Sequence, residues 1–488
     1  MVMWRNMTDG TFIAGRASER VELAHALKSG RPELIAVYGR RRVGKTYLIR
    51  GFFAEKICLE VTGARAAGLK DQLANFVRVL ETRVPYPLAV PASWADAFEM
   101  LKRYLAELLT NGERRVVFLD ELPWLASPRS GFLSALDHFW NTFASRQRNL
   151  ILVICGSAAS WMIVNVLHHK GGLHNRVTRS IALKPFNLGE AAQFLQGRGI
   201  AFDPIQTLEL FMAVGGIPYY LDKIRKGRSA AQNIDALFFV QNAALRDEFG
   251  QLYAALFEHH ERHLKIIEAL ATKRAGLTRV ELIKHSGLSG GNLSTILQEL
   301  ETTGFILRSV PFGRSVRESQ YRLIDEFTLF YLRWVKPLAR TKSGPSWWLQ
   351  QRTSPAGIAW AGYAFENACL THVVQIKKAL GISGILTEQS AWQHRVSARD
   401  KSGEQIDLLI DRPDGVINLC EMKWSGAPFV IDKRYAAILR ERAETFRRLT
   451  GTRKSLFLTF VTTHGLAPGD YVTELVANEV SAAALFEP

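Results

Sequence analysis

The chain has 488 residues, of which 47% are hydrophobic, and this composition excludes a wholly disordered protein. Its 62 lysines and arginines outnumber 46 aspartates and glutamates, and the formal charge of +16 favours a polyanionic partner such as nucleic acid. The cysteines are too widely spaced for a metal knuckle or a redox pair, so they predict buried thiols in a reducing, cytoplasmic compartment. We see no signal peptide, and the uncharged stretch 149–167 is better explained as a buried strand, a loop and a helix than as a membrane span.

A phosphate-binding loop is the clearest motif. The apolar run 34–38 predicts a buried strand, and an amphipathic helix is expected after the loop. Two glycines permit the backbone angles that direct several N–H groups at one phosphate chain, and the helix adds its positive N-terminal end. Lys45 is expected at the β- and γ-phosphates, and the Thr46 hydroxyl on Mg²⁺. The predicted nucleotide-binding residues are Gly39, Arg40, Arg41, Arg42, Val43, Gly44, Lys45 and Thr46.

Two further apolar strands end in polar residues. The run 116–119 is followed by Asp120, expected in the Mg²⁺ shell, and by Glu121, expected to act on a water in line with the γ-phosphate. The run 150–155 ends near Ser157, at a switch from strand to helix. Ser157 is predicted to sense the γ-phosphate, and a helix N-cap is the alternative role for it.

The segment that follows carries two arginines and a helical lid. Arg176 and Arg179 lie on one loop, where either one is a candidate arginine finger, acting within a subunit or between subunits, or a solvated surface residue. Two helical segments then lead to the helix break at 215–218. The tyrosines after this break are expected to pack either on an adenine or on the lid core.

These motifs resemble the ATPase domain of the archaeal-ATPase-like STAND/AAA+ group over roughly residues 10–235. The resemblance implies an α/β fold of the ASCE type, with a P-loop, a parallel sheet and a helical lid, that binds and hydrolyses ATP with Mg²⁺ and acts as a switch. It also implies that Pro218 lies near the adenine, and that Arg176 rather than Arg179 is the catalytic arginine.

The spacing of residues 263–321 predicts a winged helix, with three helical segments followed by a two-stranded wing. Its third helix exposes Glu299 and Glu301, which weaken phosphate binding, so Arg314 and Arg317 in the wing are the better candidates for contact with DNA. The alternative is a structural or relay role for this module.

Beyond a boundary expected at 343–355, Asp407 lies on one predicted strand, and Glu421 and Lys423 lie on the next. Strand alternation places Glu421 and Lys423 on one face, with Asp407 beside them. Two carboxylates bind Mg²⁺, and a lysine steadies developing charge. A surface hairpin with ordinary charges is the alternative. The basic segment 434–454 follows and is a candidate for holding backbone phosphates.

The set of Asp407, Glu421 and Lys423 resembles the PD-(D/E)xK nuclease core over about residues 360–480, with Glu366 matching its helix glutamate. The resemblance implies a C-terminal α/β domain like that of restriction endonucleases. Asp407 and Glu421 are then metal ligands, and Lys423 and Glu366 are further catalytic residues.

The expected organisation is an ATPase domain with its lid at 1–235, a winged helix and connector at 236–342, and a nuclease-like domain at 343–488. The expected function is an ATPase whose ATP state gates a Mg²⁺-dependent nuclease-like domain acting on DNA. One alternative is a non-cleaving ATP-dependent scaffold or regulator that binds DNA or protein. Another is a DNA-binding regulator that uses ATP only as a ligand. A homo-oligomer is plausible, and no membrane partner is expected.

Overall fold

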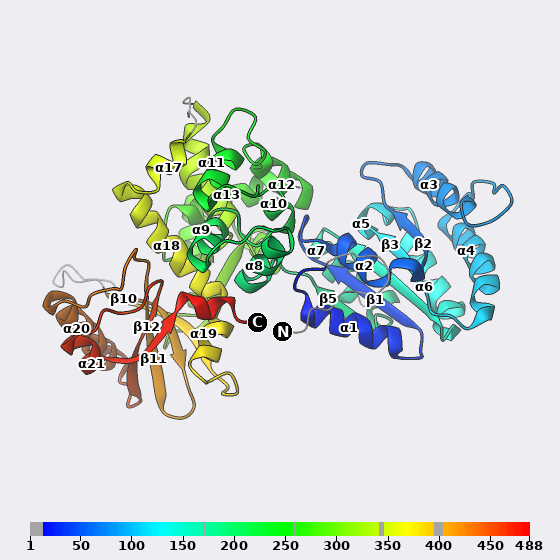
Figure 1. Ribbon diagram of the computed structural model, residues 1–488. Coiled ribbons are helices and arrows are strands. Elements are labelled where there is room, and N and C mark those ends of the chain that lie inside the picture. Colours follow the sequence, from blue (N-terminus) through cyan, green and yellow to red (C-terminus); the bar gives the residue numbers. More distant parts are fainter. Residues whose placement is uncertain (1–12, 169–171, 258, 341–345, 395–403) are drawn as a thin grey trace. The chain divides into compact units, whose positions relative to one another are not determined.

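The computed structural model describes residues 13–168, 172–257, 259–340, 346–394 and 404–488 (Figure 1). The chain divides into two compact units: residues 1–185 with 255–257, and residues 186–254 with 258–488. The first division therefore falls before the lid, rather than at the expected position 235, because the segment from Phe186 onward packs with the downstream chain.

The first unit is built on a five-stranded parallel sheet with the order β2-β3-β4-β1-β5, which confirms the expected α/β fold. Strands β1 and β4 are almost entirely buried, as apolar strands of a parallel sheet must be. The strands are β1 (Glu33–Tyr38), β2 (Ile57–Thr62), β3 (Arg115–Asp120), β4 (Leu150–Gly156) and β5 (Arg179–Ala182). The helices are α1 (Ala17–Lys28), α2 (Lys45–Phe53), α3 (Leu69–Glu81), α4 (Trp94–Leu108), α5 (Leu122–Leu125), α6 (Phe132–Thr142) and α7 (Ala159–Met162).

Aromatic side chains of α3, α4 and α6 form the core of this unit together with alternate residues of the strands. The Trp94 ring meets the Phe132 ring edge-on, with their centroids 4.7 Å apart. This packing fixes the parallel strands, so that the loops after β1, β3 and β4 open at one edge of the sheet. The expected strand, loop and helix over 149–167 are also found. None of the helices that the structure describes combines the length and the apolar character needed to cross a bilayer.

The second unit begins with a helical lid. The backbone N–H of Phe186 donates to the Gly216 carbonyl over 2.7 Å, and a Cβ on Gly216 would lie 1.8 Å from the Phe186 carbonyl oxygen, so this close approach requires glycine. Tyr220 is fully buried and donates to Glu248 over 3.0 Å, which places it in the lid core. The helices here are α8 (Leu188–Gly197), α9 (Pro204–Val214), α10 (Pro218–Leu221), α11 (Ala230–Phe238) and α12 (Glu248–Leu256), the last of which ends in residues grouped with the first unit.

Three helices and a small sheet follow, which we call the hairpin module. They are α13 (His260–Ala271), α14 (Arg279–Ser286), α15 (Gly290–Thr302), and a sheet of β6 (Leu277–Thr278), β8 (Gln320–Leu323) and β7 (Ile306–Ser309) in the order β6-β8-β7. The tip of the β7–β8 hairpin is anchored rather than free. The Phe312 N–H donates to the Ala391 carbonyl over 2.8 Å, and the Phe312 ring lies 5.2 Å from the Phe446 ring.

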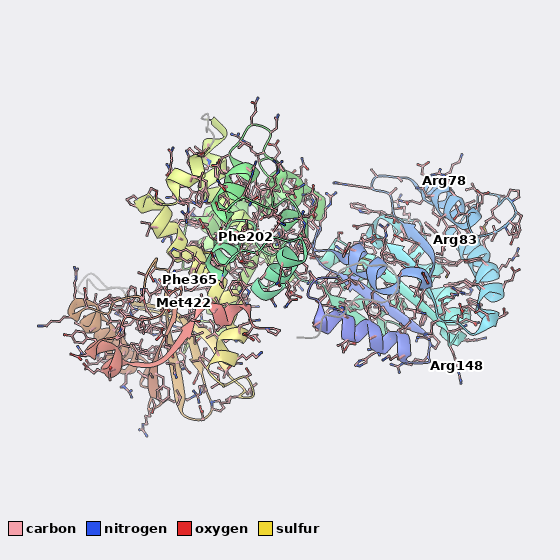
Figure 2. The ribbon with its side chains drawn as sticks, in the orientation of Figure 1. Arg78, Arg83, Arg148, Phe202, Phe365 and Met422 are labelled. Atoms are coloured by element: carbon pink, nitrogen blue, oxygen red, sulfur yellow. The ribbon has the colours of Figure 1, made fainter. Side chains whose placement is uncertain are left out.

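The C-terminal sheet has the order β13-β12-β11-β10-β9, with β9, β10 and β11 antiparallel and β11, β12 and β13 parallel. The Phe365 ring of α18 (labelled in Figure 2) lies 5.9 Å from the ring of Trp424, the residue after β11. Phe446 of α20 packs with Leu409 and Leu419 of the sheet. The strands are β9 (Glu388–His394), β10 (Glu404–Asp411), β11 (Val416–Lys423), β12 (Ser455–Thr462) and β13 (Val476–Ser481). The other elements from the connector onward are α16 (Glu326–Phe330), α17 (Trp347–Gln351), α18 (Pro355–Thr371), α19 (Val373–Ala379), α20 (Lys433–Thr450) and α21 (Asp470–Leu475).

The lid and the C-terminal part are joined by buried contacts. The neutral ring of His372 accepts from the Leu188 N–H over 2.9 Å and, through its other nitrogen, pairs with the Ala368 carbonyl over 2.7 Å. The Trp348 N–H donates to Asp235 of α11 over 2.8 Å, and the Trp348 side chain is 1% exposed. The boundary expected at 343–355 is therefore partly an internal contact, because its tryptophans complete the aromatic core around α16.

We predict that acidification loosens this junction through His372. Burial lowers the pKa of His372 from 6.5 to about 4. A depressed histidine pKa contributes stability that is present above pH 6.5 and is lost as the pH falls toward 4. The thermal midpoint of the full chain should fall over that window in the wild type, and less steeply in His372→Asn. Equal slopes for the two proteins, measured by scanning calorimetry, would contradict this role.

Candidate functional sites

The phosphate-binding loop between β1 and α2 has the backbone that the motif predicts. Gly39 and Gly44 have φ values of 151° and 90°, and a Cβ on Gly39 would lie 2.1 Å from the Leu183 carbonyl oxygen. Arg16 holds the loop from outside, because its guanidinium donates to the Val43 carbonyl over 3.0 Å and to the Lys184 carbonyl over 2.7 Å. Arg40 and Val43 are buried, Arg41 is exposed, and Arg42 has a positive φ of 70°.

Lys45 lies at the centre of a polar chain. Its Nζ donates to the Gly39 and Arg40 carbonyls over 3.0 and 3.1 Å and to Ser157 Oγ over 2.9 Å. Ser157 Oγ in turn donates to Glu121 over 2.6 Å. One serine therefore connects the loop lysine with the carboxylate expected to act on water, and its predicted role as a γ-phosphate sensor stays a prediction.

Two oxygen-bearing side chains that could bind a metal ion lie next to this series of hydrogen bonds. Thr46 Oγ1 donates to Asp120 Oδ2 over 2.7 Å, and Asp120 is 4% exposed. A hydroxyl and a carboxylate at this place suit Mg²⁺, which prefers oxygen ligands and keeps several waters. Below them, burial and the charge of Asp120 raise the pKa of the Cys155 thiol well above its usual range. All four cysteines are free and buried, as expected.

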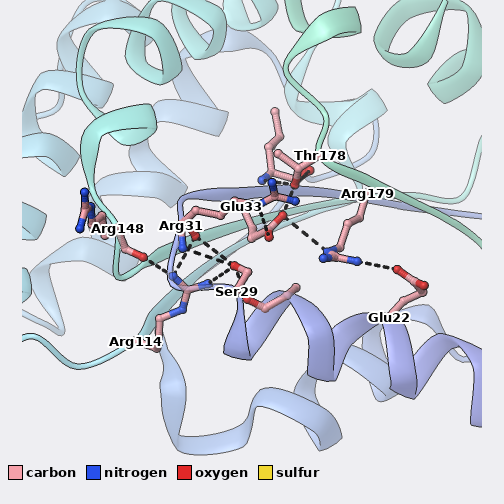
Figure 3. Close-up of polar contacts among 10 residues, drawn as sticks. Glu22, Ser29, Arg31, Glu33, Arg114, Arg148, Thr178 and Arg179 are labelled. Carbon is pink, nitrogen blue, oxygen red and sulfur yellow. Dashed lines mark hydrogen bonds and ion pairs between the residues drawn. The ribbon is translucent and has the colours of Figure 1, made fainter.

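The predicted arginines lie at the other edge of the sheet. Arg179 starts β5 and pairs with Glu22 over 2.7 Å and with the buried Glu33, which starts β1 (Figure 3). Arg176 is exposed and lies just before Thr178, whose N–H donates to the Leu34 carbonyl. Strand β1 separates this edge from Gly39 by roughly 16 Å at 3.3 Å per residue.

Two consequences follow for the arginine-finger prediction. Arg179 pairs with Glu33 at the sheet edge, where the hydrogen bond from Thr178 and, to a smaller extent, the charge of Arg179 lower the pKa of Glu33 against the opposing effect of burial. Arg176 precedes β5, which runs parallel to β1, so it lies toward the opposite end of β1 from the phosphate-binding loop, and the catalytic role predicted for it, within a subunit or between two, stays a prediction. Pro218, predicted near the adenine, belongs to the second unit, and its role stays a prediction.

In the predicted C-terminal site, Asp407 has hydrogen-bond and ion-pair partners other than Glu421 and Lys423. Asp407 receives a hydrogen bond from Gln405 and lies 3.7 Å from Arg322 of the hairpin module. Arg322 also donates to Glu366 of α18. Burial and the nearby charge of Asp407 raise the pKa of Glu366 to about 7, even though Arg322 opposes this rise.

Glu421 belongs to a second cluster. Its carboxylate contacts Lys423 Nζ at 2.7 Å, accepts from Tyr435 Oη at 2.7 Å, and accepts from Arg442 at 2.5 Å. Burial alone would raise the pKa of Glu421, but the charges of Lys423 and Arg442 lower it. Both anchoring side chains, Tyr435 and Arg442, come from α20.

The expected grouping of Asp407 with Glu421 and Lys423 is therefore not formed. The pairing of β10 with β9 shifts between Ile406 and Leu409, and such a bulge interrupts the alternation used to place Asp407. Each carboxylate is neutralised by the chain's own cations, and within the described residues no three acidic, histidine or cysteine side chains are placed to hold a metal. The donor types suit Mg²⁺, but this arrangement does not fit the ion.

Several other basic residues of the second unit form ion pairs with carboxylates. Arg314 of the hairpin pairs with Glu318 over 3.3 Å. In the segment 434–454, Arg440 pairs with Glu474 and Lys454 with Asp411. Sequence reasoning missed Arg322 and assigned Arg442, within the segment 434–454, to backbone phosphates, because only tertiary structure brings these two arginines to the carboxylates.

Comparison with known proteins identifies the ATPase part. Residues 14–224 match a family described as an ATPase domain predominantly from Archaea. This stretch is similar to that ATPase domain, and the match extends through the first unit into helices α8, α9 and α10 of the second.

Comparison of the whole chain, rather than of residues 14–224 alone, also found similar proteins. An uncharacterized protein of Methanocaldococcus jannaschii is 25% identical over 412 residues, which cover 84% of this chain and 87% of that protein. Among solved structures, a Walker-type ATPase of Pyrococcus abyssi is 17% identical, with a TM-score of 0.48, and covers 66% of this chain and 96% of its own. The ORC2 protein of Aeropyrum pernix, solved with ADPNP and ADP, is 17% identical, with a TM-score of 0.42, and covers 68% of this chain and 97% of its own.

We predict that Glu121→Gln slows ATP hydrolysis by at least about a hundredfold while ATP still binds, because the amide keeps the shape of the site but removes the carboxylate that acts on water. Turnover of labelled ATP and equilibrium binding of the nucleotide measure the two effects. Glu113→Gln, a change at an exposed residue before β3, is the matched control. Unchanged turnover in Glu121→Gln would exclude this role for Glu121.

Proposed function

We propose that this protein is an ATPase whose nucleotide state controls nucleic-acid binding by the second unit, and that its C-terminal domain binds without cleaving. Control of the second unit by the nucleotide is supported by the way the ATPase match continues from the first unit into the second. The ATPase match continues past Pro185 into the lid helices, and these helices are packed with the C-terminal domain in one compact unit.

Residues of the first unit would carry out the hydrolysis. The loop N–H groups and Lys45 bind the phosphates, and Glu121 orients water. Ser157 links these two side chains and is placed to change partners when a phosphate arrives. Thr46 and Asp120 would hold Mg²⁺, which neutralises phosphate charge when it is bound. A movement of the lid helices that follows the nucleotide state would then move everything packed on the lid.

Two observations support nucleic acid as the partner, and a third supports binding without cleavage. The formal charge of +16 favours a polyanion. The three helices and hairpin of α13 to β8 have the order of a winged-helix module, which we propose this segment to be. The internal ion pairs of Glu366, Asp407 and Glu421 favour a binding role for the C-terminal domain over the alternative of a Mg²⁺-dependent endonuclease.

The full chain, mixed with labelled DNA, ATP and either Mg²⁺ or Mn²⁺, should bind the DNA and hydrolyse ATP without cutting the DNA. Lys423→Ala should bind DNA and hydrolyse ATP as the wild type does, although loss of the ion pair with Glu421 should lower its thermal midpoint. Lys433→Ala at the start of α20 is its matched control. The measurements are gel electrophoresis of the product and release of phosphate.

Two results would overturn parts of this proposal. Cleavage that disappears in Lys423→Ala but persists in Lys433→Ala would establish the endonuclease alternative. A wild-type protein that hydrolyses ATP but binds neither DNA nor RNA would remove nucleic acid as the partner.

A further inference from the structure

Two cavities lie against the hairpin module within the second unit. The first has a volume of about 800 Å³ and lies between the β7–β8 hairpin and strands β9 and β10, with Asp407 in its lining. The second has a volume of about 550 Å³ and is lined by the hairpin and by α15, through Ser294, Gln298 and Glu301. Three arginines line both cavities: Arg279, Arg308 and Arg317.

These three arginines differ from the other basic residues nearby. Arg314 and Arg322, which also line the first cavity, are paired with carboxylates. Arg279 donates to the Gly290 carbonyl and Arg308 to the Ser319 hydroxyl, and both of these acceptors are uncharged. Within the described ranges, Arg279, Arg308 and Arg317 form no ion pair with a carboxylate.

The acidic groups of the cavities are largely neutralised. In the first cavity, Glu318 pairs with Arg314, and Asp407 lies against Arg322. In the second, Glu301 is the acidic lining residue. Three uncompensated guanidinium groups in a concave surface attract anions, and guanidinium geometry suits phosphate oxygens.

We propose that Arg279, Arg308 and Arg317 bind the phosphate backbone of a single-stranded nucleic acid that runs through both cavities. This inference rests on the proposed nucleic-acid function and assigns its binding site. Cavities of this size enclose a ligand of one or two nucleotides, whereas a duplex, with a major groove about 12 Å wide, is too large to enter them. The hairpin tip is held by Ala391 and Phe446, so it is not free to enter a groove of a duplex.

Fluorescence anisotropy tests this site with a labelled oligothymidine, an oligouridine and a duplex of equal length. We expect the full chain to prefer the single strands. The double variant Arg308→Gln and Arg317→Gln should weaken their binding roughly tenfold and reduce the salt dependence of log K by about 1.4, the value for two lost phosphate contacts on a single strand. ATP hydrolysis should be unchanged in this variant.

Two further variants make the test specific: one should leave binding unchanged, and the other should strengthen binding of the single strand. Arg434→Gln with Arg448→Gln, at two exposed positions of α20, should leave binding unchanged. Glu301→Gln should strengthen single-strand binding a few-fold, because it removes the acidic group of the second cavity. A tighter complex with the duplex would overturn the single-strand assignment.

The remaining outcomes separate this inference from the proposed function. Binding that is lost in the α20 pair but kept in the hairpin pair would place the site elsewhere and overturn this inference alone. A wild-type protein that binds none of the three probes would overturn the proposed function as well. We expect comparable affinities for oligothymidine and oligouridine, because both have the same backbone phosphates. A preference of more than about tenfold for either strand would contradict recognition through phosphate alone.

Discussion

The attachment of the lid to the C-terminal domain is the constraint on which this account depends. His372 holds the first turn of α8, Asp235 of α11 accepts from the backbone of α17, and Arg352 pairs with Glu209 of α9 over 2.7 Å. A Cβ on Gly189 would lie 2.3 Å from the Phe486 carbonyl oxygen, so α8 also approaches the end of the chain closely. These contacts join the lid and the C-terminal domain in one compact unit.

The two candidate sites differ in how their charges are balanced. At the nucleotide site, Lys45 is held by carbonyls and a hydroxyl, which are partners that a phosphate can displace without leaving a buried charge unpaired. At the C-terminal site, each carboxylate already has an arginine or lysine partner, and separating a buried ion pair is costly. The first site is therefore suited to take up a charged ligand, and the second is suited to hold the domain together.

Sequence alone predicted the features that are local. The phosphate-binding loop, the carboxylates after β3 and the serine after β4 follow from short motifs whose geometry is set by a strand and the next turn. The parallel sheet followed from buried apolar strands separated by helices. Arg176 was predicted to lie on a loop. The end of the sheet at which that loop lies depends on how β5 pairs with β1, which the local sequence does not encode.

The less accurate predictions share a physical cause. Asp407 was placed beside Glu421 by assuming unbroken alternation, and the bulge between Ile406 and Leu409 interrupts it. Trp347 and Trp348 were assigned to a domain boundary, although they pack against aromatic residues distant in sequence. Arg279 and Arg308 gave no signal because arginines on a helix and on a strand become neighbours only through the tertiary fold.

Coupling between nucleotide and nucleic acid is the central claim. It is tested most directly by the affinity of the full chain for a labelled single strand without nucleotide, with ADP, and with a non-hydrolysable ATP analogue. The account predicts that the ATP analogue and ADP give affinities that differ by at least about fivefold, and that Lys45→Ala abolishes the difference. Equal affinities in all three states, in a protein shown to bind both nucleotides, would contradict it.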